Sequence, residues 1–185
     1  MGYGKDIKFG IYNLTNSHKR QIKNFDCGTE SINNFLKEKA YKEMESGSSV
    51  TKVVIIEDDE SEDNGKIIAY YSLSASSIVI ESYSQKYFFP AAEIRMFAVL
   101  DKLHGLDFTE NKDDGTFSEY LFSSIIYDIY NLSENTIGIQ NIVLYSVPEA
   151  VNFYRDKIGF EDFTELMVKN NERYLQGCIP MCLKL

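Results

Sequence analysis

Residues Ser146 to Phe160 read Ser-Val-Pro-Glu-Ala-Val-Asn-Phe-Tyr-Arg-Asp-Lys-Ile-Gly-Phe and give the clearest local indication of the fold. This stretch carries a helix start signal with Pro148 in the first turn, where the N–H that proline lacks would have no partner anyway. Gly159 is the residue type that commonly ends a helix. The apolar residues 141–145 before it are typical of a short buried strand. The stretch therefore predicts a strand followed by a capped helix that ends at Gly159.

The rest of the chain alternates strand-like and helix-like segments. No linker rich in Pro, Gly or Ser divides the 185 residues, and no repeat of solenoid period is present. The order predicts β-α-ββ-β-α-β-α-ββ, a mixed α/β single domain over residues 1–185. The remaining predicted elements are strands at Phe9–Leu14, Val50–Glu57, Lys66–Ile80 and Glu93–Val99, helices at Thr29–Ala40 and from Thr116, and strands near Phe160–Met167 and Cys178–Leu185.

Two of these helices have clear start signals. Thr29 is the expected N-cap of the first, which carries an apolar stripe at helical spacing. The second opens on Thr116-Phe-Ser-Glu119, the pattern of a capping box. Behind it, an apolar stripe at helical spacing predicts the buried face of a long helix. Its members are Leu121, Ile125, Ile129 and Leu132.

The charge of the chain is concentrated in two places. Lys and Arg number 19 and Asp and Glu 28, so the formal charge is −9. Residues 57–63, with six acids and no base, and residues 107–115, with four acids and one lysine, account for all of it. We expect the first run to be a solvated hairpin turn. A general nucleic-acid binder or a basic membrane-binding face needs a surplus of Lys and Arg, so the charge argues against nucleic acid and membrane as partners.

Cysteine and histidine usage argues against metal and nucleophile chemistry. The three cysteines are Cys27, Cys178 and Cys182, without a CxxC pair, and the histidines are His18 and His104. We therefore expect no metal site and no Ser-His or Cys-His triad. An odd number of cysteines suits a reducing cytosol. The first residues hold no apolar signal core, and no stretch is long and apolar enough to span a bilayer, so we expect a cytoplasmic protein.

Three segments, in one order, resemble the GCN5-related N-acetyltransferases, and within them the bacterial subgroup that includes toxin-type acetyltransferases. Residues 146–160 resemble the A-x-x-F-Y-x-x-x-G-F block of the family. Residues 93–99, followed by Asp-Lys-Leu-His-Gly at 101–105, are similar to its central strand and the start of its pyrophosphate loop. Phe-Asp-Cys-Gly at 25–28 and the helix after it resemble the N-terminus of the toxin-type subgroup. The likeness covers nearly the whole chain and implies a mixed, mostly antiparallel sheet flanked by helices, with splayed central strands.

The resemblance also implies an activity, which is acetyl transfer from the co-substrate acetyl-CoA to a primary amine. Backbone groups of Phe97, Ala98 and Val99 would bind the pantetheine arm, since an unpaired strand edge offers hydrogen bonds. Tyr154 would protonate the leaving thiolate. Glu93 stands where the histone acetyltransferase branch has the base that deprotonates the amine. A packing tyrosine and a solvated or salt-bridged carboxylate are the alternative roles of these two residues.

The pyrophosphate loop is where the chain departs from the family pattern [Q/R]-x-x-G-x-[G/A]. Counted from the strand, residues 104–109 match, with Asp107 where a glycine belongs; counted back from the helix, residues 113–118 match. On this spacing only one of the two can be the loop, because the connection is longer than the family pattern. We favour the second, since phosphate binds at a helix N-terminus. The expected cofactor contacts beyond the strand are His104, Gly105, Gly115, Thr116, Ser118 and Asn152.

Acceptor and assembly stay open at the level of the sequence. Acidic loops favour a cationic amine, such as a polyamine, an aminoglycoside or a protein lysine, whereas the toxin-like N-terminus points to the aminoacyl end of charged tRNA. The altered phosphate loop keeps a non-catalytic or CoA-deficient binding protein of the same fold as an alternative. We expect the aromatic residues 83–89 to form a loop that either lines the acceptor site or covers the core. A homodimer is left open.

Overall fold

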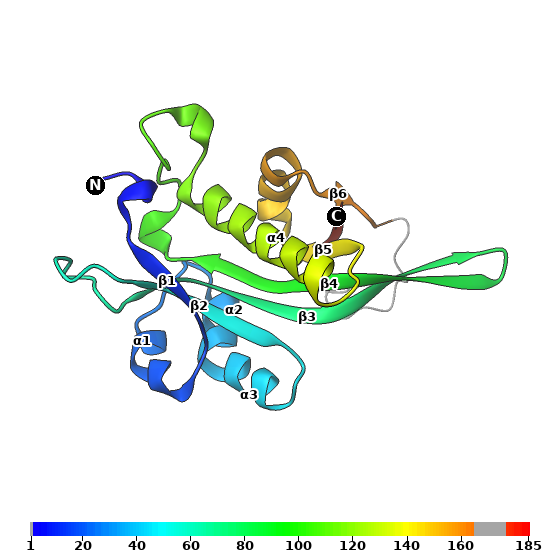
Figure 1. The fold of residues 1–185 in the computed structure, drawn as a ribbon, viewed down its shortest axis with the longest axis horizontal. Helices are drawn as coiled ribbons and strands as arrows, with labels where there is room; N and C mark the ends of the chain where they lie inside the picture. The colour runs from blue at the N-terminus through cyan, green and yellow to red at the C-terminus, as the bar shows by residue number, and fades with distance from the viewer. Residues whose placement is uncertain (1, 165–176) are drawn as a thin grey trace. The chain divides into compact units, whose positions relative to one another are not determined.

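The computed structural model describes residues 2–164 and 177–185 (Figure 1). Its strands form a seven-stranded sheet in the order β1-β2-β3-β4-β5-β7-β6. The β4–β5 pair is parallel, whereas β1–β2, β2–β3, β5–β7 and β6–β7 are antiparallel. The mixed α/β fold and the mostly antiparallel sheet that the sequence predicts are therefore confirmed.

The chain divides into two compact units. One comprises Met1–Ser74 and Met96–Leu121, and the other comprises Ala75–Arg95 and Phe122–Leu185. The strands β3 (Ile67–Ser82) and β4 (Gln85–Val99) and the helix α4 (Phe117–Asn135) each contribute residues to both. That residues 1–185 form a single domain stays a prediction.

In the first unit, β1 (Phe9–Asn13) and β2 (Val50–Ile56) continue the sheet from the first half of β3. β1 pairs with β2 from Phe9↔Ile56 to Asn13↔Lys52, and β2 pairs with β3 out to Val50↔Leu73. The predicted hairpin around the acidic residues 57–63 is thus confirmed. Helices separate β1 from β2, and they are α1 (Lys19–Lys23), α2 (Glu30–Asn34), the π-turn η3 (Phe35–Lys39) and α3 (Ala40–Glu45).

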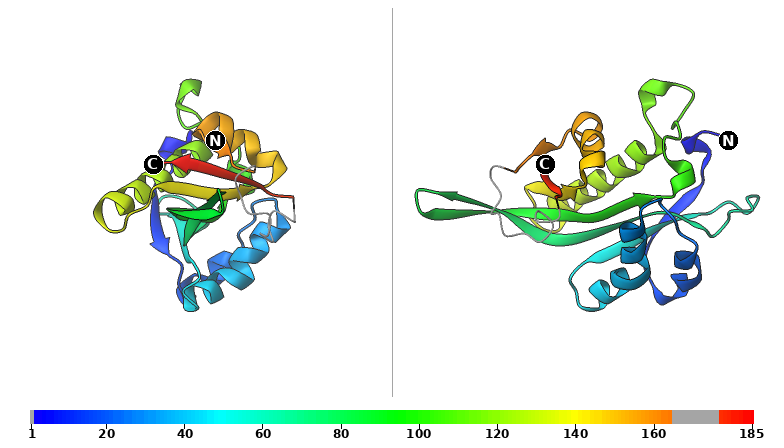
Figure 2. Two further views of the ribbon diagram at one scale, coloured as in Figure 1. Left: turned by 90° about the vertical axis from the view of Figure 1, so that its right-hand side faces the viewer. Right: turned by 180° about the vertical axis from the view of Figure 1, so that it is seen from behind.

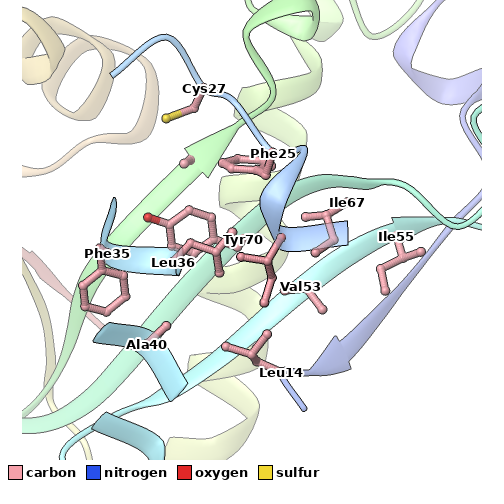
Figure 3. Close-up of a cluster of buried hydrophobic side chains, with 12 residues drawn as sticks. Leu14, Phe25, Cys27, Phe35, Leu36, Ala40, Val53, Ile55, Ile67 and Tyr70 are labelled. Atoms are coloured by element: carbon pink, nitrogen blue, oxygen red, sulfur yellow. The ribbon is translucent and has the colours of Figure 1, made fainter. Parts of the chain in front are cut away.

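Aromatic side chains pack the core between these helices and strands (Figure 3). The Tyr70 ring lies edge-on to Phe25, with centroids 5.4 Å apart, and stacks on Phe35 at 6.2 Å. Its hydroxyl donates to the carbonyl of Ile32 at 2.7 Å, so the buried phenol is satisfied. Burial raises the pKa of Tyr70, which keeps this core group neutral.

In the second unit, β5 (Asn141–Ser146) lies between β4 and β7 (Ile179–Lys184), and β6 (Glu161–Asp162) pairs with β7. The helix α4 buries Phe122, Ile125 and Ile129 along one face. Leu132, which the apolar stripe includes, is instead exposed.

Short helical turns in both units complete the described chain. They are η1 (Gly4–Asp6), η2 (Asn16–His18), η4 (Asp101–Leu103), η5 (Lys112–Asp114), η6 (Pro148–Ala150) and η7 (Phe153–Ile158).

The first helix differs from its prediction at both ends. Thr29 stands at the N-cap, but its side chain does not cap. Instead the Asn33 amide accepts from the Cys27 N–H at 3.0 Å and donates to the Asp26 carboxylate at 2.7 Å. The N–H of Gly28 donates to the same carboxylate, and these bonds, Gly28 first, lower the pKa of Asp26. Helical structure continues beyond Ala40 to residue 45.

Two further expectations need correction. The aromatic stretch 83–89 is not a loop, because β3 and β4 run to a two-residue turn at Tyr83 and Ser84, and the other five residues lie in β4. Hydrogen bonding between the neighbouring strands β3 and β4 extends both of them to this turn. The strand predicted near Phe160–Met167 is described only as Glu161–Asp162, and its residues from 165 onward lie outside the described part of the chain.

Candidate active site

Tyr154 lies on the helical segment that follows β5. Pro148 begins a 3-10 turn, and the chain continues through the π-helical turn η7. Gly159 has a φ of 94°, and the N–H of Phe160 donates to the carbonyl of Tyr154 at 2.9 Å. This is the Schellman-type ending in which only glycine adopts the left-handed position without strain. The predicted helix stop at Gly159 is confirmed. π-turns are frequent at functional sites.

Three phenylalanine rings surround the Tyr154 ring. Phe153, Phe122 and Phe160 lie edge-on to it, with centroids 5.1, 5.2 and 6.1 Å away. Burial among them raises the pKa of Tyr154 well above its ordinary value. Within the described part of the chain, no group hydrogen-bonds the Tyr154 hydroxyl. A neutral phenol in an apolar wall with an uncommitted O–H is suited to donate a proton.

Asn152 and Arg155 form a small polar cluster on the same segment. The Arg155 guanidinium donates to Asn152 Oδ1 at 2.7 Å and to the Asp156 carboxylate at 2.8 Å. The Asp156 carboxylate raises the pKa of Arg155, and the guanidinium lowers that of Asp156. Asn152 is exposed, but its carbonyl oxygen already accepts a hydrogen bond. Its role as a cofactor contact stays a prediction.

The parallel pairing of β4 with β5 is short. It runs from Ala91↔Asn141 to Ile94↔Leu144, and Glu93 lies opposite Val143 within it. β4 then continues through five more residues to Val99. Glu93 is half-buried on this strand and belongs to the same unit as Tyr154.

The end of β4 is fixed by His104, one of the residues that the sequence analysis expects to contact the cofactor. The His104 Nε2 lies 2.9 Å from the carbonyl oxygen of Val99 and donates to it. Its Nδ1 lies 3.6 Å from the Asp101 carboxylate. The N–H of the next residue, Leu100, donates to the carbonyl of Ile68. The Val99 carbonyl is therefore already bonded within the protein, and the pantetheine contacts of Phe97, Ala98 and Val99 stay predictions.

The two alternative phosphate loops meet in the structure. Asp107 and Thr116 form an antiparallel bridge, and the N–H of Phe108 donates to the carbonyl of Gly115 at 2.9 Å. Residues 108–115 are therefore a closed excursion, and the segments 104–107 and 116–118 on either side lie next to each other. Pairing across the base of the excursion brings the two segments together, and which of them binds the phosphates stays a prediction.

The excursion also holds most of the acidic charge of this region. Asp113 and Asp114 lie in η5 and are exposed, as is Glu110. The Asp114 carboxylate accepts from the hydroxyl of Thr109 and from the Asn111 amide. The Asp114 carboxylate therefore bonds within the excursion, whereas Glu110 and Asp113 are exposed on it.

The N-terminus of α4 is capped by its own side chains. The predicted capping box is confirmed, since the N–H of Glu119 donates to Thr116 Oγ1 at 3.3 Å and the N–H of Thr116 donates to the Glu119 carboxylate at 3.0 Å. The N–H of Phe117 donates to the carbonyl of Leu106 at 2.8 Å. Among the described residues, Ser118 has the one N–H of these four without an acceptor. A pyrophosphate here would meet the Glu119 carboxylate.

Gly115 makes that arrangement possible. Its φ is 76°, in the left-handed region that favours glycine. A Cβ built at Gly115 would clash with the Glu119 carboxylate. The sequence analysis predicts Gly115 as a contact for the phosphates. It does not predict that the Glu119 carboxylate occupies the same place, although Glu119 is part of the predicted capping box.

The sequence-derived residues fall into two sets. The first unit holds the β4 end (Phe97, Ala98, Val99), His104, Gly105 and the Gly115–Ser118 segment, within which His104 contacts Val99 and Gly115 adjoins Glu119. The second unit holds Glu93, Asn152 and Tyr154. Gly105 has a φ of 70°, and a Cβ added to it would meet no atom within 4 Å, so it serves a turn.

Solved structures resemble this fold over nearly the whole chain. A tyrosine-to-phenylalanine mutant of the toxin AtaT, bound to the C-terminus of the antitoxin AtaR and acetyl-CoA, aligns with a TM-score of 0.68 at 17% identity, covering 96% of this chain and 93% of that chain. A tyrosine-to-phenylalanine mutant of KacT aligns at 0.67 and 18%, covering 96% and 95%. AtaT complexed with acetyl-methionyl-tRNAfMet aligns at 0.66 and 18%, covering 96% and 95%. No protein-family model matches the chain.

The chain has the GCN5-related N-acetyltransferase fold. The expectation from charge that nucleic acid is not a partner is not supported for this fold, because the KacTA complex has been solved with DNA and AtaT with a tRNA.

The cysteines Cys27 and Cys182 and the possible metal ligands of the described residues can be assessed from the structure. No three His, Cys, Asp or Glu side chains of the described part cluster as a metal site. Cys27 and Cys182 are buried and free, and burial raises the pKa of both thiols, which disfavours the reactive thiolate. No helix in the described ranges has the length and hydropathy to cross a membrane.

Proposed function

We propose that this protein transfers the acetyl group of acetyl-CoA to a primary amine. The observation that carries the proposal is Tyr154, a neutral phenol enclosed by three aromatic rings on a π-turn, with an uncommitted hydroxyl. The same fold has been solved with acetyl-CoA in AtaT, and the AtaT and KacT structures carry a tyrosine-to-phenylalanine change.

The residues of this chain would divide the chemistry as follows. The amine attacks the thioester carbonyl carbon, so a C–N bond forms and the C–S bond breaks. Tyr154 gives its proton to the departing sulfur, and Glu93 or a water takes the proton that the amine loses. Backbone groups of Phe97, Ala98 and Val99 would hold the pantetheine arm, and the amide near Phe97 would polarise the thioester carbonyl. The phosphates would lie by the Ser118 N–H, and Glu119 would have to turn away from them.

Among amine acceptors, the aminoacyl end of charged tRNA has support from one surface. Residues 7–25 contain Lys8, Lys19, Arg20 and Lys23 and no acid. The last three lie on α1, are exposed, and have no carboxylate within ion-pair distance in the described part. These cations could neutralise tRNA phosphates. The total charge of −9 does not reveal this local basic surface. AtaT has been solved with acetyl-methionyl-tRNAfMet.

The test is acceptor-dependent release of the CoA thiol. The purified protein is mixed with acetyl-CoA and, separately, with aminoacylated tRNA, the same tRNA deacylated, spermidine, and a lysine peptide. We expect thiol release with aminoacylated tRNA and none with the deacylated control. Release with spermidine or the peptide instead would keep acetyl transfer and overturn the tRNA acceptor. No release with any of them would overturn this choice of acceptors.

A second candidate function is a CoA-deficient binding protein of the same fold. The observation in its favour is the α4 N-terminus, where Thr116, Leu106 and Glu119 occupy three of the N–H groups that a pyrophosphate would use. It predicts no acetyl-CoA binding by isothermal titration, whereas the acetyltransferase predicts binding.

A further inference from the structure

A pocket of about 370 Å³ lies beside α1 in the first unit. One wall is formed by α1 and the residue that ends it, with Arg20, Gln21 and Asn24 lining the pocket. The opposite wall is the β2–β3 turn at residues 64–66. Figure 2 (right) shows α1 and this turn next to each other. The volume lies within the usual range for sites that bind small molecules, so the pocket has room for one nucleobase and its ribose.

The floor of this pocket belongs to the hydrophobic core. Ile67, labelled in Figure 3, is 3% exposed and Leu100 is half-buried, and both pack in the core cluster of the first unit. The N–H of Leu100 donates to the carbonyl of Ile68 at 2.7 Å, which ties the end of β4 to β3. The floor is therefore already formed and offers an apolar contact to the face of a planar ring.

Two side-chain amides on the α1 wall are uncommitted. The exposed amide of Asn24 makes no hydrogen bond within residues 2–164 and 177–185. The Gln21 Oε1 is buried, and no described group donates to it. The amide of Asn64 on the opposite wall, in contrast, accepts from the N–H of Asp58 at 3.2 Å and donates to Asp59 at 3.1 Å. A buried acceptor without a donor is costly, and a donor from a ligand would satisfy it after a rotation of the Gln21 amide.

The charges around the pocket favour an anionic ligand that lies along α1. Arg20 is exposed, and no described carboxylate lies within ion-pair distance of it. Across the pocket, the ammonium of Lys66 pairs with the Asp63 carboxylate, so each neutralises the other. The rest of the acidic turn, residues 57–62, repels phosphates on that side. A phosphate backbone is therefore favoured along α1 and disfavoured along the turn.

We propose that this pocket binds one unpaired base of an RNA whose phosphates lie along α1. The inference rests on the proposed tRNA acceptor and names the part of that RNA which the pocket takes. Arg20 pairs with the phosphate of the bound nucleotide, and the amides of Gln21 and Asn24 supply a donor and an acceptor each to the edge of its base. Lys19 and Lys23, on the same helix but outside the pocket, hold neighbouring phosphates.

Such a pocket distinguishes RNA by its pairing state. A paired base keeps its edge in the base pair and its faces in the stack, so it does not enter, whereas an unpaired base is free to do so. RNA with an unpaired end should therefore bind more tightly than a continuous duplex of equal charge. The lysines of α1 alone do not supply this preference, because phosphate contacts are insensitive to pairing and sequence.

Fluorescence anisotropy without acetyl-CoA tests the pocket. The probes are an RNA duplex of about 12 base pairs with an unpaired 3′ overhang and a blunt duplex with the same number of phosphates. We expect the wild type to bind the overhang probe about 10-fold more tightly. Gln21→Leu combined with Asn24→Ala should remove this preference and leave the Kd of the blunt duplex unchanged, which also shows that the variant is folded. The matched control is Asn34→Ala, which removes an exposed amide of α2 outside the pocket and should keep the preference.

Two charge variants then separate base binding from phosphate contacts. Lys19→Gln should weaken the binding of both probes by the same factor, whereas Arg20→Gln should weaken the overhang probe more than the blunt one. An equal Kd of the two probes for the wild type, or a preference that persists in the Gln21 and Asn24 double variant, would overturn the proposal. Loss of the preference on adding saturating acetyl-CoA would also overturn it, because the pocket would then take the adenine of that molecule.

Failure of the pocket and failure of the tRNA acceptor give different results. Thiol release with spermidine and none with aminoacylated tRNA overturns the acceptor and, with it, the role of the pocket. Thiol release with aminoacylated tRNA, together with equal binding of the two probes, overturns the pocket alone.

Discussion

Two segments of this chain differ in how closely they match the acetyltransferase sequence pattern. Residues 146–160 keep the family block, and the structure gives Tyr154 an apolar enclosure and a helix stop at Gly159. Residues 104–119 depart from the family pattern. In the structure, a bridge between Asp107 and Thr116 closes off residues 108–115 as a separate loop, and the Glu119 carboxylate caps the N-terminus of α4. In the proposed reaction, Tyr154 already stands in its apolar enclosure, whereas a pyrophosphate at the N-terminus of α4 would require the Glu119 carboxylate to move.

The largest expected effect is at Tyr154. Tyr154→Phe keeps the ring among its three phenylalanine neighbours and removes only the proton donor, so kcat should fall by about 10²–10⁴-fold while KM for acetyl-CoA changes little. Steady-state thiol release measures both constants. Tyr127→Phe, on the exposed face of α4, is the matched control and should retain full activity. A kcat within about two-fold of wild type would remove Tyr154 from the mechanism.

The phosphate segment should respond in the opposite direction. Glu119→Gln keeps the hydrogen bonds of a capping box but removes a negative charge from the N-terminus of α4. We expect the Kd of acetyl-CoA to fall by about 3–10-fold, with a smaller effect at high salt, measured by isothermal titration. Glu110→Gln removes a charge from the excursion and serves as the control. Weaker binding by Glu119→Gln would contradict the view that this carboxylate opposes the phosphates.

A substitution at Gly115 tests how much the Glu119 cap at the N-terminus of α4 contributes to stability. Gly115→Ala places a Cβ against the Glu119 carboxylate at a φ of 76°, whereas Gly65→Ala has a similar φ of 78° and no neighbour within 4 Å. Both lose about 1 kcal/mol from the backbone, and we expect Gly115→Ala to lose roughly 1–2 kcal/mol more through the broken cap. Chemical denaturation compares their free energies of unfolding. Equal losses would show that the contact with Glu119 contributes nothing.

The smallest effect concerns pH. Burial raises the pKa of Tyr154, so the phenol keeps its proton at and above its ordinary value of about 10, and the acid form is lost only at higher pH. In the wild type, kcat should therefore not decline between pH 8 and about 10 through ionisation of this group. A pH–rate profile of kcat checks this, and a fall with an apparent pKa near 9 that Tyr154→Phe abolishes would contradict it.

The parts of the fold that local signals specify were predictable. Pro148 and Gly159 bound one helix, and Thr116 with Glu119 begins another, because caps and helix stops depend on residues close in the sequence. The turn at Tyr83 and Ser84 was not predictable, since it lacks the usual Asn and Gly and is imposed by the pairing of the two long strands β3 and β4.

In the candidate site, too, features set by nearby residues could be predicted, whereas those set by tertiary contacts could not. Tyr154 could be named from its motif, but its aromatic enclosure comes partly from α4, far away in the sequence. The bridge between Asp107 and Thr116, and the bond from His104 to Val99, are tertiary contacts that no periodicity signals. The basic surface of α1 could have been predicted, because residues 7–25 contain four basic residues and no acid. The net charge of −9 gives no sign of it, since it sums over the whole chain.

The most direct measurement for the central claim is isothermal titration of the wild-type protein with acetyl-CoA up to millimolar concentration, with Glu119→Gln titrated in parallel. We predict saturable binding at one site per chain, tighter in Glu119→Gln. No binding to either protein at millimolar acetyl-CoA would contradict the acetyltransferase proposal and leave a CoA-deficient binding protein as the function of this fold.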